Sequence, residues 1–508
     1  MSAPSEPEKY SIEEMMERLQ SHPPEGLNED CELVTREDGS QALRVRKRKR
    51  RSQQPHKEQR LHTRRTRMIQ VSTALILLLL GIFLAGVAIV YANSTPFREK
   101  ILRHIALSTG ANGELEQFRV NPTSANAARV SLTWPEGNAL QNLTLNSVKA
   151  EISLSSFYGQ ALTGEDLTAA EGTLLLRVCP ADQSPRYASA PVENPPIRFD
   201  RYAITKAQLL LGDPAAPLIR LRNAEVSFSP VTLNDHAQLL LSGGEVTIHG
   251  WPKLRMDRSH IEFRDSAIDI VGMRLRHETD SRGLFELNGS VTPYASERAS
   301  TLAVHLESYL LAGIVGPELG RLFSGRIDTL PEDQSNSLAF SLGQDPTASL
   351  ALVFHNAPAD SIELNGFPFL FGLSQTIGDD WFEHPLFDND VSGAIHRADG
   401  RVTIRDLNFE TKGRLAVRGA LTMAADKSLS GQLEVGVATA MIKAAKSRHL
   451  DTLFGPPSES FRWLTLTIGG TASAPTDNFK QLFQASKPAK SPPAGGEIPS
   501  FEELTAPK

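Results

Sequence analysis

The chain has 508 residues, with 53 basic and 59 acidic side chains and a formal net charge of −6, which argues against a nucleic-acid-binding protein. Its two cysteines exclude a disulfide-stabilised secreted scaffold. The length exceeds one ordinary compact domain, although an extended sheet or solenoid could use all of it.

Residues 1–68 are predicted to be a mostly disordered cytoplasmic arm. Residues 1–40 carry a net charge of −8 and residues 41–68 a net charge of +11. The acidic part favours disorder, and the alternative is a short docking helix over Ser11–Leu19, which begins with a capping box. The basic run Arg46–Arg51 is better explained by membrane topology and contact with anionic lipid than by nucleic acid.

Residues 69–91 contain no charged side chain and are predicted to be a transmembrane helix. Their 23 residues exceed the roughly 20 that a helix needs to cross a bilayer. The alternative is a cleaved signal peptide that ends at Val90–Ala92, but this apolar core is longer than usual and 68 residues precede it.

The orientation of the helix follows from its flanking charge. Residues 44–67 hold 12 Lys or Arg and one acid, Glu58, and such basic flanks stay in the cytoplasm. Residues 92–508 are therefore predicted to lie on the other side of the membrane. Cys31 and Cys179 then lie on opposite sides and cannot pair within one chain.

After the apolar segment, a short helix is predicted over Phe97–Leu107, ended by Gly110 and Gly113. From about residue 115 apolar residues recur with period two, as in strands with one apolar and one polar face. This alternation includes Leu143, Leu145, Val148, Ala150, Ile152, Val226, Phe228, Ile261, Phe263, Ile268, Ile270, Phe285, Leu287, Leu429 and Val437.

Turn signals separate these runs, such as those at residues 242–244, 397–400 and 425–427. The predicted fold is mainly β: a long antiparallel, curved, groove-like sheet with a few short helices, after one N-terminal transmembrane helix. Helices are predicted within 309–323, 367–377, 440–454 and 477–485, a long loop over 180–197, and a disordered tail over 487–508.

Catalytic signatures are missing from the sequence. It contains no phosphate-binding loop, no nucleophile elbow and no His-Glu-x-x-His motif, so we predict a protein that is not an enzyme, without catalytic residues or cofactor. His384 and His396 lie near acids, but their spacing fits no standard metal site, so we predict no metal. Asp379–Asp380 is better explained by helix capping than by acid–base chemistry. Cys179 is better explained as an ordinary residue at the end of a strand than as a reactive thiol.

An apolar sheet face must be covered, either by the protein itself or by a ligand. Beside a membrane the natural ligand is an acyl chain, each methylene of which gains about 0.8 kcal/mol on leaving water. The residues predicted to face lipid are Val402, Ile404, Leu407, Phe409, Leu415, Val417, Leu433, Val435, Leu464, Leu466 and Ile468.

Three stretches resemble the AsmA-like proteins of diderm bacteria. Residues 140–162 are similar to the opening strands of that family after its membrane helix. Residues 390–435 resemble its C-terminal cadence of strand, Asp-Gly turn and strand. Residues 464–475 resemble its Gly-Thr-x-x-x-Pro ending.

The resemblance implies a curved groove-forming sheet and a role in phospholipid transport or outer-membrane homeostasis, and it carries no catalytic residues. It divides the exported region into 92–384 and an AsmA-like C-terminal part, 385–486. We expect a single-pass inner-membrane protein with a periplasmic C-terminal region that binds phospholipid acyl chains. The alternative is a non-enzymatic assembly or scaffold protein of the cell envelope that acts through a protein partner.

Overall fold

The computed structural model describes residues 31–35, 37–39, 41–45, 54–153, 162–178, 197–230, 236–264, 267–292, 300–330, 333, 335–342, 346–388, 390–445 and 447–486. Several predictions on the arm, on Cys179, on the loop that follows it and on the C-terminal tail lie outside these residues. Internal contacts divide the chain into two compact units, residues 1–85 and 86–508.

The first unit holds an antiparallel hairpin and most of one long helix. Strand β1 (Cys31–Thr35) pairs with β2 (Gln41–Val45), which the charge pattern of the arm did not predict. Helix α2 spans Gln54–Ala92, and its segment Arg64–Ala92 is the one helix in the described chain that is long and apolar enough to cross a membrane. The predicted apolar span 69–91 lies within this helix.

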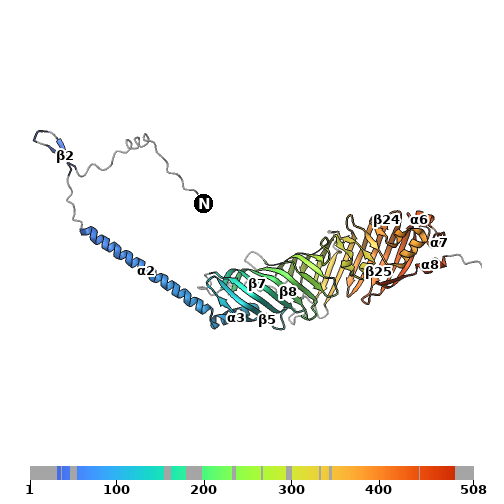
Figure 1. The fold of residues 1–508 in the computed structure, drawn as a ribbon, viewed down its shortest axis with the longest axis horizontal. Helices are drawn as coiled ribbons and strands as arrows, with labels where there is room; N and C mark the ends of the chain where they lie inside the picture. The colour runs from blue at the N-terminus through green and yellow to red at the C-terminus, as the bar shows by residue number, and fades with distance from the viewer. Residues whose placement is uncertain are drawn as a thin grey trace, which may run out of the picture. The chain divides into compact units, whose positions relative to one another are not determined.

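After the last turns of α2, the second unit continues with helix α3 (Thr95–Thr109) and then with one large sheet (Figure 1). Helix α3 confirms the predicted helix, and it ends at Gly110, which adopts φ 70° and donates its N–H to the Ala106 carbonyl. Pro96 occupies the first turn, where its missing N–H costs nothing.

The sheet follows the predicted strand pattern. Its first strands are β3 (Asn112–Glu116), β4 (Arg119–Val120), β5 (Ser124–Thr133), β6 (Leu140–Glu151), β7 (Leu162–Leu176), β8 (Ile197–Leu211), β9 (Ile219–Ser229), β10 (Ala237–Ser242), β11 (Glu245–Ile248), β12 (Leu254–Arg264), β13 (Ala267–His277) and β14 (Leu284–Val291). The later strands are β15 (Ser300–Glu307), β16 (Tyr309–Leu310), β18 (Arg326–Asp328), β19 (Ser337–Ser341), β20 (Thr347–Asn356), β23 (Asp390–Ala398), β24 (Arg401–Thr411), β25 (Leu415–Met423), β26 (Leu429–Ala438), β27 (Pro457–Ser458), β28 (Phe461–Thr471) and β29 (Ala474–Asp477).

These 24 strands form one curved ladder from β3 to β29. Five places in the ladder hold two short strands in succession, as where β10 and β11 both pair with β9 and β12. No pairing between described residues joins β3 to β29, so the two edges stay apart. The ladder continues across residue 385, because β20 pairs with β23.

Two details differ from the predicted meander. Strands β7 and β8 pair in parallel instead of antiparallel. Residues 242–244 are not a turn: Gly243 and Gly244, at φ 67° and 100°, only interrupt a strand line that continues from β10 into β11. The predicted Asp399–Gly400 turn is confirmed, with φ of 49° and 73° joining β23 to β24 as a two-residue hairpin.

Many strands change phase once along their inner face. In a regular strand, one outward-facing residue lies between two successive inner-face residues. Two residues lie between them in the pairs Ala127/Val130, Leu145/Val148, Ala169/Gly172, Ile204/Ala207, Leu221/Ala224, Ile270/Met273 and Ile404/Leu407. Ser147, Asn223 and Asp406 adopt positive φ at three of these points. Such irregularities bend a strand, which lets the sheet curl around its apolar face.

The strand ends form two rims. Rim A carries the turns at residues 134–139, 249–253 and 278–283, and rim B carries the turns at residues 399–400 and 424–428. Between the strands, the chain leaves the sheet at rim A and forms α4 (Leu311–Val315), η2 (Leu319–Arg321), β17 (Phe323–Ser324), β21 (Ile362–Leu364), α5 (Pro368–Leu373), η3 (Ser374–Gly378), η4 (Asp380–Glu383), β22 (Leu386–Phe387), α6 (Thr439–Ala444) and α7 (Leu450–Leu453). The last helix, α8 (Phe479–Ala485), follows β29, which begins beside the rim B end of β28.

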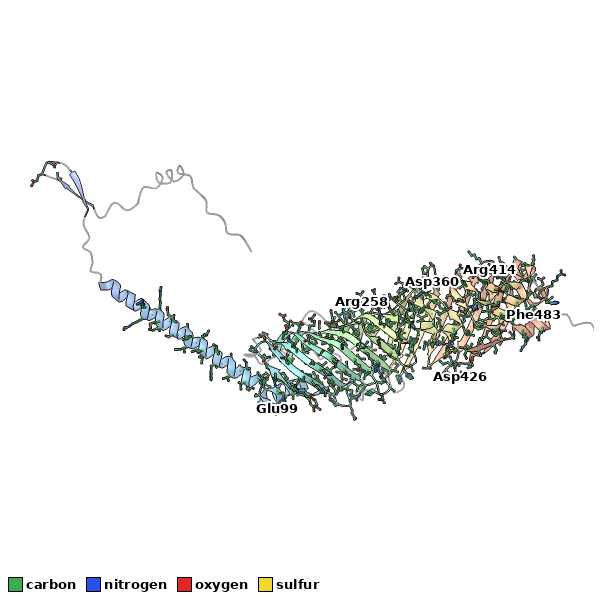
Figure 2. All side chains as sticks on the ribbon, viewed as in Figure 1. Glu99, Arg258, Asp360, Arg414, Asp426 and Phe483 are labelled. Carbon is green, nitrogen blue, oxygen red and sulfur yellow. The ribbon has the colours of Figure 1, made fainter. Side chains whose placement is uncertain are left out.

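These inserted segments fill the inside of the C-terminal half. Their side chains Ile314, Leu370, Ile442 and Phe479 belong to one buried apolar cluster with the inner face of the strands. Glu99 on α3 and Phe483 on α8 mark the two ends of the sheet unit (Figure 2). The helices are shorter than predicted: the 309–323 candidate, for example, is broken after Val315 by Gly316 and Pro317.

An ion pair closes rim A where the filled half begins. Both terminal guanidinium nitrogens of Arg326 donate to Asp280, at 2.8 and 2.9 Å, and the side chains of Arg326 and Asp280 are only 10% and 7% exposed. Asp280→Asn leaves the Arg326 charge buried and uncompensated, so we expect the free energy of unfolding to fall by about 3–5 kcal/mol. Chemical unfolding followed by tryptophan fluorescence measures this.

The same pair predicts a pH dependence. Arg326, helped by the amides of Arg282 and Gly283 and opposed by burial, holds the pKa of Asp280 well below its ordinary 3.8. A carboxyl with a lowered folded pKa stabilises the fold above its unfolded pKa and loses that contribution as the pH falls below about 4. The stability difference between wild type and Asp280→Asn should therefore shrink in acid.

The matched control is Arg264→Met, which removes an arginine that is 53% exposed and pairs with Glu262 and Asp269. It should cost less than about 1 kcal/mol. Equal losses in Asp280→Asn and Arg264→Met would contradict this account of the rim.

Candidate functional site

The inner face of β5–β9 carries continuous rows of apolar side chains, and we call this surface the groove. Each member of a row pairs directly with the next across the strands. One row is Leu132, Leu143, Leu174, Leu209 and Leu221. A second row continues to β13 and consists of Ala125, Ala150, Leu167, Tyr202, Phe228, Leu239, Ile261 and Ile270.

The opposite face of the same strands is polar. Lys149 pairs with Thr168, and Asn146 with Glu171, between the groove residues. On this face Arg201 forms two hydrogen bonds with Asp166, at 2.9 and 2.8 Å. Alternation thus places most apolar groups on one side, as the sequence predicted, although Leu175 and Leu210 pair on the opposite face near rim A.

The groove is less covered than the equivalent face in the C-terminal half. Leu132, Leu143, Leu174 and Leu209 are only partly buried. In the C-terminal half the eleven residues predicted to face lipid are almost fully buried, since Leu464 is 9% exposed and the other ten are 2% exposed or less.

Those eleven residues lie on the inner face, as their alternation predicted, but they are core residues in this structure. They are Val402, Ile404, Leu407, Phe409, Leu415, Val417, Leu433, Val435, Leu464, Leu466 and Ile468, and all belong to the cluster that includes the inserted helices. Because the inserted segments cover them, they present no open lining to a ligand. The uncovered apolar face lies instead on strands that the prediction did not single out.

The end of α2 is fixed to the start of the groove. The Asn93 side chain donates to the Val120 carbonyl at 2.7 Å and accepts from the Val120 N–H at 2.8 Å. Ala92 is 3% exposed and packs in one cluster with Val120, Ala125 and Ala150. The second groove row therefore begins directly at the last turn of this apolar helix.

Helix α3 closes the same end of the sheet. Phe97, near its start, packs against the cluster of Ala125 and Phe199, and the Thr109 carbonyl at its end accepts from Trp134 Nε1 at 2.9 Å. Between them, Leu102 packs over Gly113, where an added Cβ would come within 3.0 Å of it. The helix thus crosses from one rim to the other.

Aromatic rings line the groove near rim B. Phe199, Tyr202, Phe228 and Phe263 form successive ring contacts, with centroids 6.0, 6.0 and 6.3 Å apart. Burial raises the pKa of the Tyr202 phenol, opposed by a hydrogen bond from the Phe199 backbone. The phenol therefore stays neutral at physiological pH.

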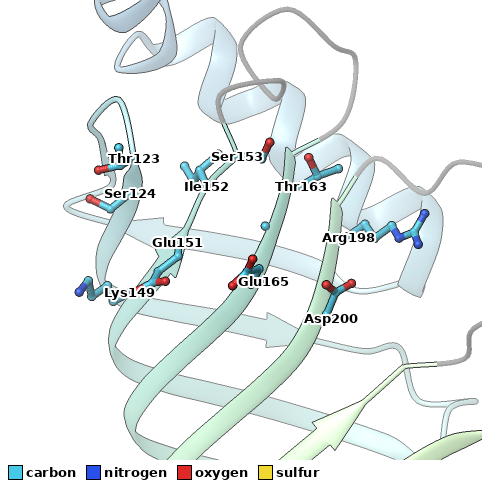
Figure 3. Close-up of a pocket in the computed structure, with 11 residues that line it drawn as sticks. Thr123, Ser124, Lys149, Glu151, Ile152, Ser153, Thr163, Glu165, Arg198 and Asp200 are labelled. Atoms are coloured by element: carbon cyan, nitrogen blue, oxygen red, sulfur yellow. The ribbon is translucent and has the colours of Figure 1, made fainter. Parts of the chain in front are cut away.

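A polar hollow of about 800 Å³ lies on the outer face at the same end (Figure 3). Its lining mixes charges of both signs, with Lys149 and Arg198 beside Glu151, Glu165 and Asp200. The arrangement of these groups does not suggest a reaction.

The polar candidates from the sequence do not assemble into one site. Among the described residues no group of three or more His, Cys, Asp or Glu could hold a metal ion. His384 contacts the side chain of Asn365 at 2.7 Å, whereas His396 lies on β23, opposite Ala351 and Thr403. Asp379 accepts from the Trp381 N–H at 3.0 Å, which confirms its capping role.

Searches of protein families, of curated proteins and of solved structures found no match to this chain.

Because the groove is less covered than the inner face of the C-terminal half, a cysteine placed in the groove should react faster with a thiol reagent. In a chain with Cys31→Ser and Cys179→Ser, a small apolar thiol reagent should label Leu145→Cys at least about tenfold faster than Leu433→Cys, because Leu433 is 0% exposed and needs local unfolding. Labelling rates in detergent, followed by mass spectrometry, test this. Equal rates would show that the two halves are equally covered.

Proposed function

We propose that this chain is a membrane-anchored protein that binds lipid acyl chains in the groove of its N-terminal half. The observation that carries the proposal is the continuous, partly exposed apolar surface that begins at the last turn of α2. Contiguous apolar surface of this kind marks a binding site, since soluble proteins otherwise cover it. The last turn of a helix that is apolar and long enough to cross a membrane packs at this end of the groove, so a lipid is the ligand closest at hand.

The dimensions of the groove suit this ligand. The longer row crosses β5, β6, β7, β8, β9, β10, β12 and β13, which at about 4.8 Å a step gives roughly 34 Å. One leaflet of a bilayer core is about 15 Å thick, so the row could shield acyl chains over most of their length. At about 0.8 kcal/mol for each buried methylene, even ten methylenes contribute about 8 kcal/mol.

The filled half limits how far a lipid could travel. In the C-terminal half the inner face is closed by Leu370, Ile442 and Phe479 from the inserted helices. We therefore favour binding or hand-over of lipid in the N-terminal half over a conduit that runs the whole length of the sheet. Opening the distal half would require α5 and α8 to leave the core.

We infer the cellular location from the charge that flanks the apolar helix and from the resemblance to a known family. The 12 basic residues within 44–67 favour a cytoplasmic arm and an exported region 92–508. The resemblance to AsmA-like proteins supports the inner membrane and periplasm of a diderm envelope, with phospholipid transport or outer-membrane homeostasis as the process. The envelope scaffold remains the alternative class.

Native mass spectrometry of the full-length chain, purified from membranes, tests lipid binding. We expect at least one phospholipid per chain in the wild type and loss of most of it in the double variant Leu145→Glu/Ile204→Glu, because two carboxylates on the inner face repel acyl chains. Lipid extraction from the same sample identifies the bound species.

The matched control is Thr144→Glu/Ala203→Glu, which puts the same charges on neighbouring residues of the outer face. It should retain lipid, and thermal unfolding checks that both variants fold. A wild type free of lipid that copurifies with a constant envelope protein would overturn the proposal in favour of the scaffold.

A further inference from the structure

The two rims of the sheet meet at one place. Residues of the rim A turn 249–253 line one cavity together with the rim B turns 399–400 and 424–428, although more than 140 residues separate them in sequence. Arg397, at the end of β23, makes the central contact: its guanidinium donates to the carbonyls of Gly250 and Ile314. Arg397 thus ties the curled sheet together.

Arg397 is a buried cation without an acidic partner. It is 9% exposed, and its Cζ lies 4.9 Å from the centre of the Trp251 ring. No carboxylate of the described chain forms an ion pair with it, and burial lowers its pKa with no acid to oppose the shift. A buried charge is normally paired, so this one lacks the counter-charge that its position requires.

The cavity beside Arg397 has a volume of about 480 Å³. Trp251, Val315 and Met423 form apolar walls, and Lys427 contributes a second cation. Glu318, the one acid among the described residues of the lining, lies 4.0 Å from Arg321. The cavity is therefore apolar with a net positive charge, and its size is typical of small-molecule sites.

We propose that this cavity binds an organic oxyanion, whose carboxylate or phosphate group contacts Arg397 and Lys427 and whose apolar part packs on Trp251. A guanidinium has five N–H donors, of which two are directed at the Gly250 and Ile314 carbonyls. The others can donate to an anion, and such charge-assisted hydrogen bonds are strong when water is excluded. The site is separate from the groove and does not depend on lipid binding there.

Quenching of Trp251 fluorescence tests the site in the full-length chain. The probes are a brominated short-chain carboxylate and its neutral methyl ester, and inorganic phosphate serves as a competitor. Trp251→Phe identifies the part of the signal that comes from this cavity, since the chain has four tryptophans. We expect saturable quenching by the carboxylate and none by the ester.

Variants assign the contacts. Arg397→Met and Lys427→Gln should each weaken carboxylate binding by about tenfold or more, because a hydrogen bond to a charged group is lost. Arg397→Lys keeps the charge and the rim contact but not the planar fork, and should also bind less tightly. The control Arg405→Met removes an exposed arginine from the neighbouring strand and should bind as the wild type does.

The outcomes separate the possible ligands. If inorganic phosphate displaces the brominated carboxylate at an equal concentration, a free oxyanion is sufficient for binding. If phosphate does not displace it, the apolar walls of the cavity contribute to binding. Equal quenching by ester and carboxylate, or unchanged binding in Lys427→Gln and Arg397→Lys, would overturn the proposal and leave Arg397 as a structural tie alone.

Discussion

The structure of this protein depends on the need to cover one continuous apolar face of its sheet. Alternating residues along each strand place apolar groups on one side, and such a face is stable only when water is kept from it. The C-terminal half meets this requirement with its own inserted segments, so that Phe409 and Leu433 are almost fully buried. The N-terminal half leaves Leu143, Leu174 and Leu209 partly exposed, and this unequal cover divides one sheet into a core and a groove.

The curl of the sheet is what makes both halves possible. Phase changes such as Leu145/Val148 and Ile404/Leu407 bend the strands around the apolar face. Curling brings opposite rims together, and Arg397 joins them through Gly250 and Ile314. The cation needed for this contact also creates the charged cavity, so the closure of the fold and the proposed oxyanion site share a cause.

Much of the fold could be predicted from local patterns. Period-two alternation, the Asp399–Gly400 turn and the apolar helix each follow from neighbouring residues. The sequence shows a phase change as a spacing of three residues, as between Leu145 and Val148, instead of two. Without the structure, such a spacing is read as a continuation of the alternating pattern. The parallel pairing of β7 with β8 depends on a long connection, and the burial of Val417 depends on segments inserted between distant strands. Strand periodicity therefore identified the apolar face but could not show which half of it remains open.

Site-specific photocrosslinking in living cells tests the central claim, that lipid occupies only the open half. A photoreactive amino acid would replace Leu174 in the groove or Val417 in the filled core, and lipid adducts would be identified by mass spectrometry. We predict phospholipid adducts at Leu174 and only crosslinks within the chain at Val417. Adducts at both positions, or at neither, would contradict the division of the sheet into an open groove and a closed core.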